Sequence, residues 1–168
     1  MVLFPERLIV NRSLRRALNG HPFELRYDTA FERVLEACAE APRPGQSGTW
    51  LHAPLRQGLA ALHAAGYAHS AEAWLDGELV GGLYGVTLGR VFFGESMFAR
   101  APNASKVVFV NLVGELTRMG YTLIDCQAYT DNLARFGAEE IEGELFYELF
   151  CDLSARAPQR AWPTQSAP

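Results

Sequence analysis

The stretch Val91–Tyr129, VFFGESMFARAPNASKVVFVNLVGELTRMGYTLIDCQAY, has the pattern of a strand, a loop, a helix and a second strand. Its apolar start predicts a strand that ends at Gly94, Asn103 or Ser105 is the expected helix N-cap, and Gly120 is a typical helix stop. Apolar residues recur at helical spacing between these points and form one broad face, which consists of Val107, Phe109, Val110, Val113, Leu116 and Met119. The rest of the chain is arranged around this unit.

Polar side chains stand at the end of each of these two strands. Asp125 and Gln127 alternate in the second strand, so they are expected on one face, with Cys126 packing on the other. Buried polar groups are costly unless they meet partners. Together with Glu95, which follows the first strand, they form a candidate site. The alternative is that Asp125 and Gln127 cap loops or bond to the backbone, and the pattern leaves both interpretations open.

Several motifs, taken together, resemble the bacterial leucyl/phenylalanyl-tRNA–protein transferases. No single motif decides the resemblance, but the set follows the order and spacing of that family from about Arg12 to Leu149. The motifs are Gly48-Thr49-Trp50, His69-Ser70-x-Glu72-x-Trp74, Glu78 to Val86, Gly94-Glu95-Ser96-Met97-Phe98, Asn103-Ala104-Ser105-Lys106 and Leu123-Ile124-Asp125-Cys126-Gln127.

The resemblance implies an α+β fold of the acyl-CoA N-acyltransferase (GNAT) type, a mixed sheet flanked by helices. The order of expected elements agrees, with a meander of three strands followed by helix, strand and helix. Coenzyme-A enzymes carry a glycine-rich pyrophosphate loop at the position of residues 100–105. That spacing is absent here, and Pro102 has no N–H to offer. We therefore expect neither coenzyme A nor another cofactor.

The resemblance also implies an activity and a set of site residues. The family transfers leucine, phenylalanine or methionine from aminoacyl-tRNA to a protein that starts with Arg or Lys, and the product is recognised for proteolysis. Asp125 and Gln127 match the catalytic pair, with Asp125 taking or relaying charge. Glu95 would hold the substrate ammonium, and Trp50 would face the terminal adenosine of tRNA. Two interpretations stay open for a set of apolar residues, which can form an ordinary core or a pocket for the aminoacyl side chain. These residues are Leu83, Met97, Phe109, Leu112, Leu116 and Ile124.

Length and charge limit the other classes of function. A chain of 168 residues predicts one domain, over residues 1–153, and its Ala-, Pro- and polar-rich end predicts a disordered tail over residues 154–168. The net charge of −4 does not indicate a general nucleic-acid binder. The sequence still allows a local patch that binds tRNA, because several basic side chains share one face or flank the site. These residues are Arg12, Arg15, Arg16, Arg100 and Lys106. The other interpretation is a solvated face.

Cysteine usage and hydropathy add three expectations. Three widely spaced cysteines without a CxxC pair predict neither a disulfide framework nor a zinc site, and His63 and His69 lack metal-ligand spacing. No signal peptide opens the chain and no apolar run approaches the length of a membrane span. A cytoplasmic protein without a metal is therefore expected, and its oligomeric state is open.

The sequence also departs from the family pattern. Typical members carry a further N-terminal domain ahead of Met1–Val10, which indicates a short form. Asn132 stands where many members have histidine, Arg135 where serine is common, and residues 142–143 where Pro-Arg is common. These departures weaken the expectation of tRNA binding. They leave open a non-catalytic module of the same fold that binds basic N-termini or a tRNA acceptor end, and an N-acyltransferase that uses another activated donor.

Overall fold

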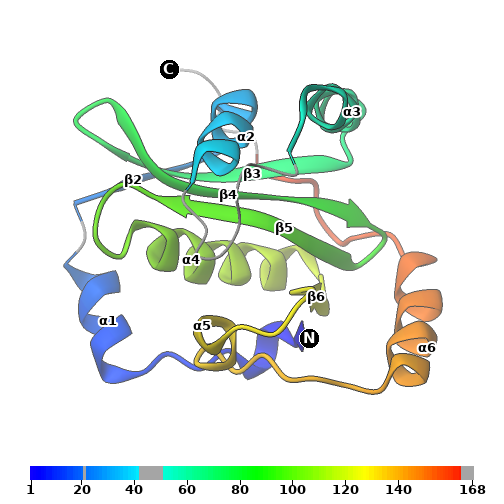
Figure 1. Ribbon diagram of the computed structural model, residues 1–168. Helices are drawn as coiled ribbons and strands as arrows, with labels where there is room; N and C mark the ends of the chain where they lie inside the picture. Colours follow the sequence, from blue (N-terminus) through cyan, green and yellow to red (C-terminus); the bar gives the residue numbers. More distant parts are fainter. Residues whose placement is uncertain (21, 42–50, 164–168) are drawn as a thin grey trace.

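A six-stranded sheet organises the computed structural model, which describes residues 1–20, 22–41 and 51–163 (Figure 1). The strand order is β1-β6-β5-β4-β3-β2, and neighbours are antiparallel except for the parallel pair β5 and β6. The strands are β1 Val2–Leu3, β2 Glu24–Tyr27, β3 Ala68–Leu75, β4 Glu78–Leu88, β5 Val91–Ala99 and β6 Leu123–Asp125. The expected meander corresponds to β3, β4 and β5.

Helices cover both faces of the sheet, with α2 and α3 on one side and α4 on the other (Figure 1). None of the described helices is long and apolar enough to cross a membrane. The helical segments are η1 Pro5–Arg7, α1 Arg12–Asn19, α2 Phe31–Glu40, α3 Ala53–Ala64, α4 Ala104–Met119, α5 Asp131–Ala134 and α6 Gly143–Ser154. This mixed sheet between helices confirms the predicted α+β architecture.

Two hydrophobic clusters fill the two sides of the sheet, one beneath α4 and one beneath α2 and α3. The α4 side depends on Gly81, where a Cβ would lie 2.6 Å from the Cβ of Ala104. The absence of a side chain at Gly81 therefore lets the first turn of α4 lie directly on β4. The strand also bulges here, because the register with β3 shifts between Ala73 and Trp74.

The predicted ends of the two central strands need correction. β5 continues past Gly94 to Ala99, because a shift in its pairing with β4 leaves Glu95 as an extra residue between Gly94 and Ser96. A bulge of this kind bends a strand without ending it. β6 is shorter than expected and ends at Asp125, and Gln127 lies beyond it with a φ of 59°. The period-two argument, which requires continuous strand, therefore does not hold for Gln127.

The ends of α4 confirm one prediction and correct another. Gly120 has a φ of 83° and accepts the left-handed conformation that closes the helix, as expected. Neither predicted N-cap side chain bonds to the helix. Asn103 occupies the N-cap position with a φ of 65° but makes no side-chain cap bond, and Ser105 lies inside the helix.

A buried carboxylate organises the start of α2. Glu72 is fully buried on β3, and its Oε1 accepts hydrogen bonds from the backbone N–H groups of Thr29 (3.0 Å) and Ala30 (2.9 Å). The hydroxyl groups of Thr29 and Ser70 and the indole N–H of Trp74 also donate to it. A buried carboxylate is tolerated when hydrogen-bond donors surround its oxygens in this way. The Glu72 side chain thereby takes the place of the local N-cap that α2 lacks.

The predicted tail, residues 154–168, lies partly within the described residues. Ser154 ends α6, and residues 155–163 then lie against the body of the molecule. Trp162 packs against the core beneath α4. Burial of one indole and a few backbone hydrogen bonds thus order a segment whose composition predicts disorder. Residues 164–168 lie outside the described residues.

Candidate functional site

A cavity of about 520 Å³ opens where β5 and β6 separate. The two strands pair only over residues 91–93 and 123–125 among the residues that the structure describes. Beyond that point the bulge at Glu95 bends β5 away, and α5 and the segment before it close the other side. The size is typical of a site for a small organic group. The cavity is lined by Leu83, Tyr84, Phe92, Gly94, Glu95, Ser96, Met97, Phe109, Ile124, Cys126, Gln127, Ala128, Thr130, Asn132 and Leu133.

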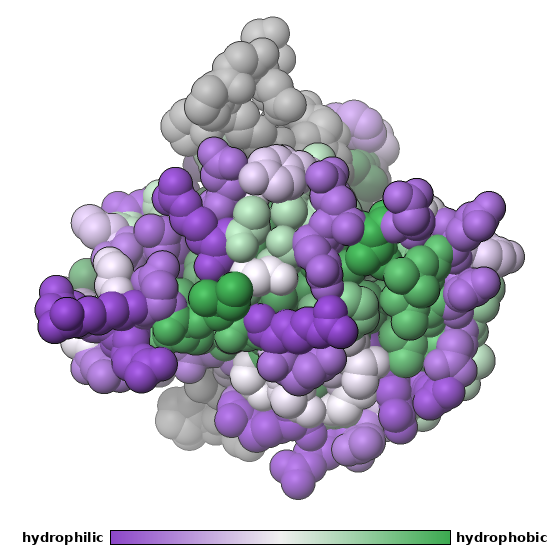
Figure 2. All heavy atoms as spheres, turned by 90° about the horizontal axis from the view of Figure 1, so that it is seen from below, coloured by the Kyte–Doolittle hydropathy of each residue, from purple (hydrophilic) through white to green (hydrophobic). Residues whose placement is uncertain are grey.

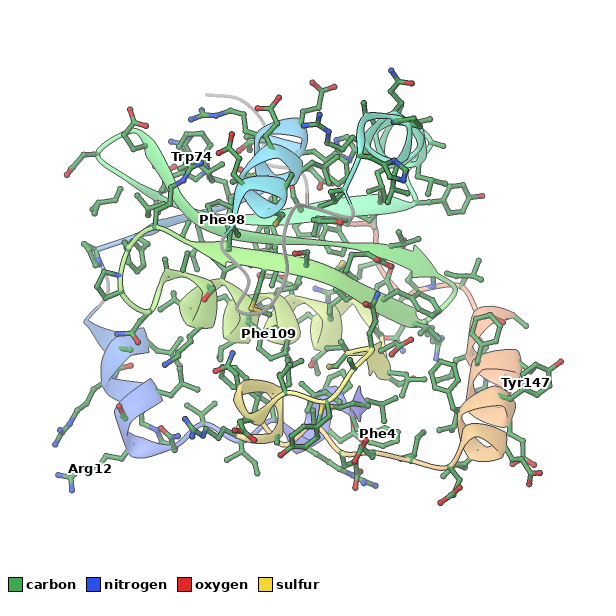
Figure 3. The ribbon with its side chains drawn as sticks, viewed as in Figure 1. Phe4, Arg12, Trp74, Phe98, Phe109 and Tyr147 are labelled. Carbon is green, nitrogen blue, oxygen red and sulfur yellow. The ribbon has the colours of Figure 1, made fainter. Side chains whose placement is uncertain are left out.

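The structure brings most of the predicted site residues to this cavity. Glu95 and Gln127 line it together with Leu83, Met97, Phe109 and Ile124. Phe109 projects from α4 toward the α5 segment, where its ring lies 4.9 Å from that of Phe136 (Figure 3). Leu112 and Leu116 are not among the lining residues and are fully buried in the hydrophobic cluster around α4. The prediction for Trp50 lies outside the described residues.

Glu95 and Gln127 contact each other across the opening. The side-chain amide of Gln127 donates a hydrogen bond to Oε2 of Glu95 at 3.1 Å. Partial burial raises the pKa of Glu95 above its ordinary value of 4.5, the Gln127 bond lowers it, and the nearby charge of Asp125 raises it further. A carboxylate in an apolar cavity with one neutral partner retains the capacity to bind a cation.

Asp125 lies beside the cavity and does not line it. Its Oδ1 accepts a hydrogen bond from the backbone N–H of Gln127 at 2.8 Å. This bond closes a tight turn after β6 and holds Gln127 in the left-handed region. Asp125 thus follows the alternative interpretation, bonding to the backbone, whereas the side chain of Gln127 reaches the cavity.

Cys126 belongs to the wall of the cavity. The side chain is buried beneath α4, and burial raises the pKa of its thiol to about 12. At neutral pH the sulfur is therefore protonated and a poor nucleophile. It contributes packing, as its alternation with Asp125 indicates.

Nine of the lining residues were not proposed as site residues from the sequence, and four of them show why. In the sequence Phe92 has the pattern of an ordinary strand residue. Thr130, Asn132 and Leu133 belong to the α5 segment. Thr130 caps α5 through a bond from the Leu133 N–H at 3.2 Å, which is a local signal for a helix start and carries no information about a cavity. Only the departure at Asn132 from the family pattern pointed to this segment.

The predicted basic residues lie outside the cavity on exposed surface. Arg12, Arg15 and Arg16 are exposed on α1, and hydrophilic atoms dominate that end of the face in Figure 2, with Arg12 pointing outward in Figure 3. α1 contacts α4, whose first turn carries the exposed Lys106. Arg100 forms an ion pair of 3.3 Å with Glu40, so its charge is partly neutralised.

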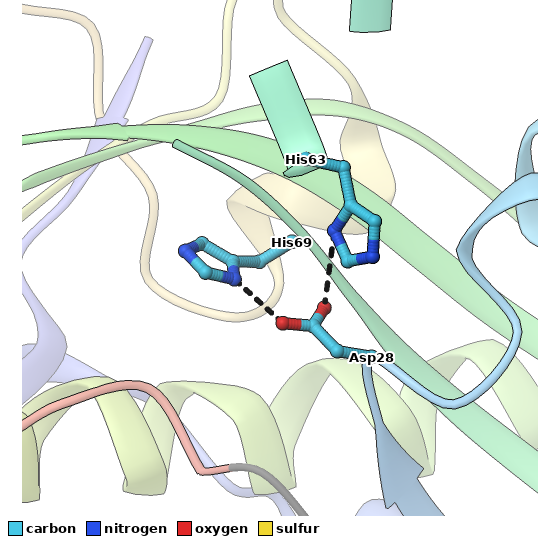
Figure 4. A group of neighbouring side chains, drawn as sticks. All are labelled: Asp28, His63 and His69. Carbon is cyan, nitrogen blue, oxygen red and sulfur yellow. Dashed lines mark hydrogen bonds and ion pairs between the residues drawn. The ribbon is translucent and has the colours of Figure 1, made fainter. Parts of the chain in front are cut away.

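A group of metal-type ligands lies at a different corner of the sheet. The nitrogen and oxygen atoms of Asp28, His63 and His69 lie within 4.8 Å of one another (Figure 4). Their atoms already have protein partners. Nδ1 of His69 contacts Asp28 at 2.7 Å, Nδ1 of His63 contacts the Ala68 carbonyl at 2.8 Å, and the Ser70 N–H donates to Asp28 at 2.7 Å. The group therefore has the arrangement of a structural hydrogen-bond network.

Comparison with known proteins gives a consistent result for residues 2–150, which match the model of the family described as leucyl/phenylalanyl-tRNA protein transferase. A protein of that name from Myxococcus xanthus is 56% identical over 138 residues, which are 82% of this chain and 59% of the relative. Its namesake from Nitrosomonas eutropha is 48% identical over 98% of this chain and 73% of the relative. The chain thus spans about three fifths to three quarters of the length of these relatives.

Solved structures are similar in fold alone. An aminoglycoside acetyltransferase from a soil metagenome, in complex with trehalose, has a TM-score of 0.51 at 18% identity, over 72% of this chain and 92% of that one. L-PGS from Bacillus licheniformis has a TM-score of 0.52 at 15% identity, over 83% of this chain and 48% of that one. These similarities confirm the GNAT-like fold.

Proposed function

The chain belongs to the leucyl/phenylalanyl-tRNA–protein transferase family, and from that premise we propose that it transfers leucine, phenylalanine or methionine from aminoacyl-tRNA to the N-terminal amine of a protein that starts with Arg or Lys. The observation that carries the proposal is the cavity between β5 and β6, where an apolar wall meets the paired side chains of Glu95 and Gln127. An aminoacyl ester has the same two parts, an apolar side chain and a polar head.

The reaction needs positioning more than activation, because the donor is already an ester. The acceptor amine attacks the ester carbonyl as the free base, and a C–N bond forms. The C–O bond to the terminal ribose then breaks, and the ribose oxygen leaves with the proton that the amine gives up. Holding the two substrates together can account for a large part of such an acceleration, and stabilising the oxyanion adds to it.

Each polar residue then has a separate role. Glu95 lines the cavity and holds the ammonium group of the aminoacyl donor as an ion pair. Gln127 is neutral at all relevant pH values, so it orients the ester and the incoming amine without acting as a base. Asp125 is a positioning residue through its bond to the Gln127 backbone, and its negative charge stabilises the positive charge that develops on the attacking amine.

The lining also limits which donors compete. Leu83, Met97, Phe109 and Ile124 offer an apolar surface without a polar group to select among apolar side chains. One methylene in such a pocket changes discrimination by about 1–3 kcal/mol, so branched and aromatic donors of similar size should compete. Charged aminoacyl groups are excluded more strongly, because their desolvation is expensive.

The test is transfer of radiolabelled leucine or phenylalanine from charged tRNA to a peptide that starts with Arg, with an otherwise identical peptide that starts with Ala as the control. We expect labelling of the Arg peptide only, and loss of labelling in Asp125→Ala. Acetyl-CoA as the donor should give no product. A purified protein that labels neither peptide with any aminoacyl donor would contradict the proposal.

A further inference from the structure

The chain after α6 returns to the sheet and is fixed at two points. Nε of Arg90 donates to the carbonyl of Ala157 at 2.9 Å, next to the start of β5. The backbone N–H of Gln159 donates to the carbonyl of Met119 at 2.8 Å, at the end of α4. This segment, residues 155–163, lies outside the part of the chain that matches the family model. The family model therefore assigns no role to it.

Trp162 inserts into a row of aromatic rings on the α4 side of the sheet. Its indole stacks on His69 of β3, with ring centroids 4.0 Å apart and planes 14° apart. Phe92 of β5 lies 6.1 Å away and nearly parallel, at 15°. Tyr27 of β2 meets the indole edge-on at 6.5 Å. Side chains from three strands are thus joined through one residue of the C-terminal segment.

Glycine in the intervening strand makes this row possible. Gly85 of β4 pairs with His69 of β3, and a Cβ on Gly85 would lie 2.3 Å from the Phe92 ring. Because Gly85 has no side chain, the ring of Phe92 lies across β4 toward Trp162. Trp162 is therefore a neighbour of the Phe92 ring, with no side chain at Gly85 between them.

His69 is a rigid base for the indole. Its Nδ1 contacts the carboxylate of Asp28 at 2.7 Å, and its Nε2 contacts the carbonyl of Gly66 at 3.2 Å (Figure 4 shows the Asp28 contact). With both ring nitrogens held, the imidazole plane cannot rotate without breaking a hydrogen bond. A stacked partner on that plane is fixed as well, and the stack contributes beyond simple burial.

Phe92 connects this row to the candidate site, because it also lines the cavity between β5 and β6. We propose that Trp162 is a positioning residue of this site: clamped on His69, it holds Phe92 in the cavity wall and so sets the size of the aminoacyl pocket. This inference rests on the proposed function. It assigns a part in donor binding to a segment beyond the residues that match the family model.

The test compares Trp162→Ala with Trp162→Phe. The phenylalanine variant keeps an aromatic ring on His69. It loses the second ring of the indole, whose N–H is buried and has no hydrogen-bond partner within the described part of the chain. We expect Trp162→Ala to raise the KM for leucyl- and phenylalanyl-tRNA about three- to tenfold, which is the contribution of an aromatic pair. The KM for the acceptor peptide should stay unchanged, and Trp162→Phe should recover most of the loss.

The control is Leu35→Ala, which truncates a buried side chain of α2 on the other side of the sheet. Loss of stability alone would affect both variants, whereas the proposal predicts a changed donor KM and a changed leucine-to-phenylalanine ratio only in Trp162→Ala. Equal KM values and equal ratios in folded Trp162→Ala and wild type would overturn it.

A second measurement separates this inference from the proposed function. The 3′-amide analogue of phenylalanyl-adenosine cannot be hydrolysed like the ester, and its binding can be followed by calorimetry without any transfer. Weaker binding to Trp162→Ala than to wild type and Leu35→Ala supports the inference. Unchanged binding contradicts it, even if transfer by the wild type is active. A wild type that binds the analogue but transfers nothing overturns the proposed function alone.

Discussion

Glu95 illustrates a conflict between stability and function at a single residue. Its pKa is raised mainly because the carboxylate is removed from water, so the fold prefers the protonated form. A group with a raised pKa in the folded state contributes most to stability below its unfolded pKa, and that contribution is lost as pH rises through the folded pKa. At neutral pH the ionised Glu95 therefore costs stability, which a bound substrate ammonium would recover under the proposed function.

Replacing Glu95 by glutamine should separate the two effects. Glu95→Gln is expected to unfold at a higher temperature than wild type at pH 7, and the difference should vanish below pH 4.5, where both side chains are neutral. Transfer should fall roughly 10- to 100-fold, the loss of one hydrogen bond to a charged group. Thermal unfolding at pH 4 and pH 7 checks the first part. A lower unfolding temperature at pH 7 would show that the carboxylate stabilises the fold.

The same carboxylate predicts a pH profile for the wild type. Ionised Glu95 is the form that holds an ammonium, so kcat/KM for the donor should decline in acid. Because the pKa of Glu95 is raised, the decline should begin at a higher pH than for an ordinary glutamate. Glu95→Gln should lack this decline over the same range.

The side chain of Gln127 reaches the cavity because its backbone adopts a strained conformation. Its φ of 59° is unfavourable for a residue with a Cβ, by about 1–2 kcal/mol. Gln127→Gly and Gln127→Ala both remove the amide, but only glycine relieves the strain. We expect both to lose transfer and the glycine variant to be more stable than the alanine variant by about 1 kcal/mol. Urea unfolding of the pair measures the difference, and an alanine variant equal to glycine would show that the turn is unstrained.

The residues of the site were more predictable in identity than in placement. Glu95 and Gln127 both line the cavity, yet the reason given from the sequence, a shared strand face, does not apply to Gln127. The actual cause is a turn in which Asp125 bonds to the Gln127 N–H. A local pattern of alternating residues cannot reveal where a strand ends, because that depends on the pairing of β6 with β5 and β1.

At the scale of elements, the contact between α4 and β4 depends on a missing side chain. Gly81 lies against Ala104 so closely that a Cβ would come within 2.6 Å. Gly114, in the middle of α4, has open space at the equivalent point. These two glycines offer a matched pair, because the same substitution is expected to have opposite signs.

Gly81→Ala should destabilise the protein by about 1–3 kcal/mol, because α4 must move away from the sheet or the backbone must shift. Gly114→Ala should stabilise it by about 0.5–1 kcal/mol, since alanine is the better helix former. Chemical denaturation of the two variants beside wild type checks both signs. If Gly81→Ala were neutral, the first turn of α4 would have room to move, contrary to the packing described.

Most elements could be predicted because each has a strong local signal. The Gly120 stop of α4 is an example, and it is present. The start of α2 could not be predicted in the same way. Its capping group is Glu72, more than forty residues away in the sequence, and only the assembled sheet brings it there. The bulge at Glu95 likewise arises from the register between two strands.

At the scale of the whole molecule, the C-terminal segment departs most from what composition predicts. Polar and small residues dominate after Ser154, and a composition average hides the effect of one tryptophan. Trp162 packs on a surface of aromatic rings that β2, β3 and β5 contribute. That surface exists only after the sheet has formed, so no local pattern could have placed the segment.

Charge is distributed so that a net acidic protein still offers one basic surface. Arg12, Arg15 and Arg16 lie on α1, which contacts α4, the helix that carries Lys106 in its first turn. They lie outside the cavity. This position is expected for a group that binds the phosphates of tRNA and does not contact the aminoacyl end. If these residues bind phosphates, each contact releases a counterion, and donor affinity must depend on salt concentration.

Replacing Arg12, Arg15 and Arg16 together by glutamine should therefore raise the KM for aminoacyl-tRNA and flatten its dependence on salt. Each lost phosphate contact should lower the slope of log KM against log salt concentration by about 0.7–0.9. An aminoacyl-adenosine donor has no phosphates, so its KM should be the same for wild type and the triple variant. Arg156→Gln, at an exposed arginine just after α6 that is paired with Asp152, is the control for a general change in charge. An unchanged salt slope in the triple variant would assign these arginines to a solvated face, and tRNA would have to bind elsewhere.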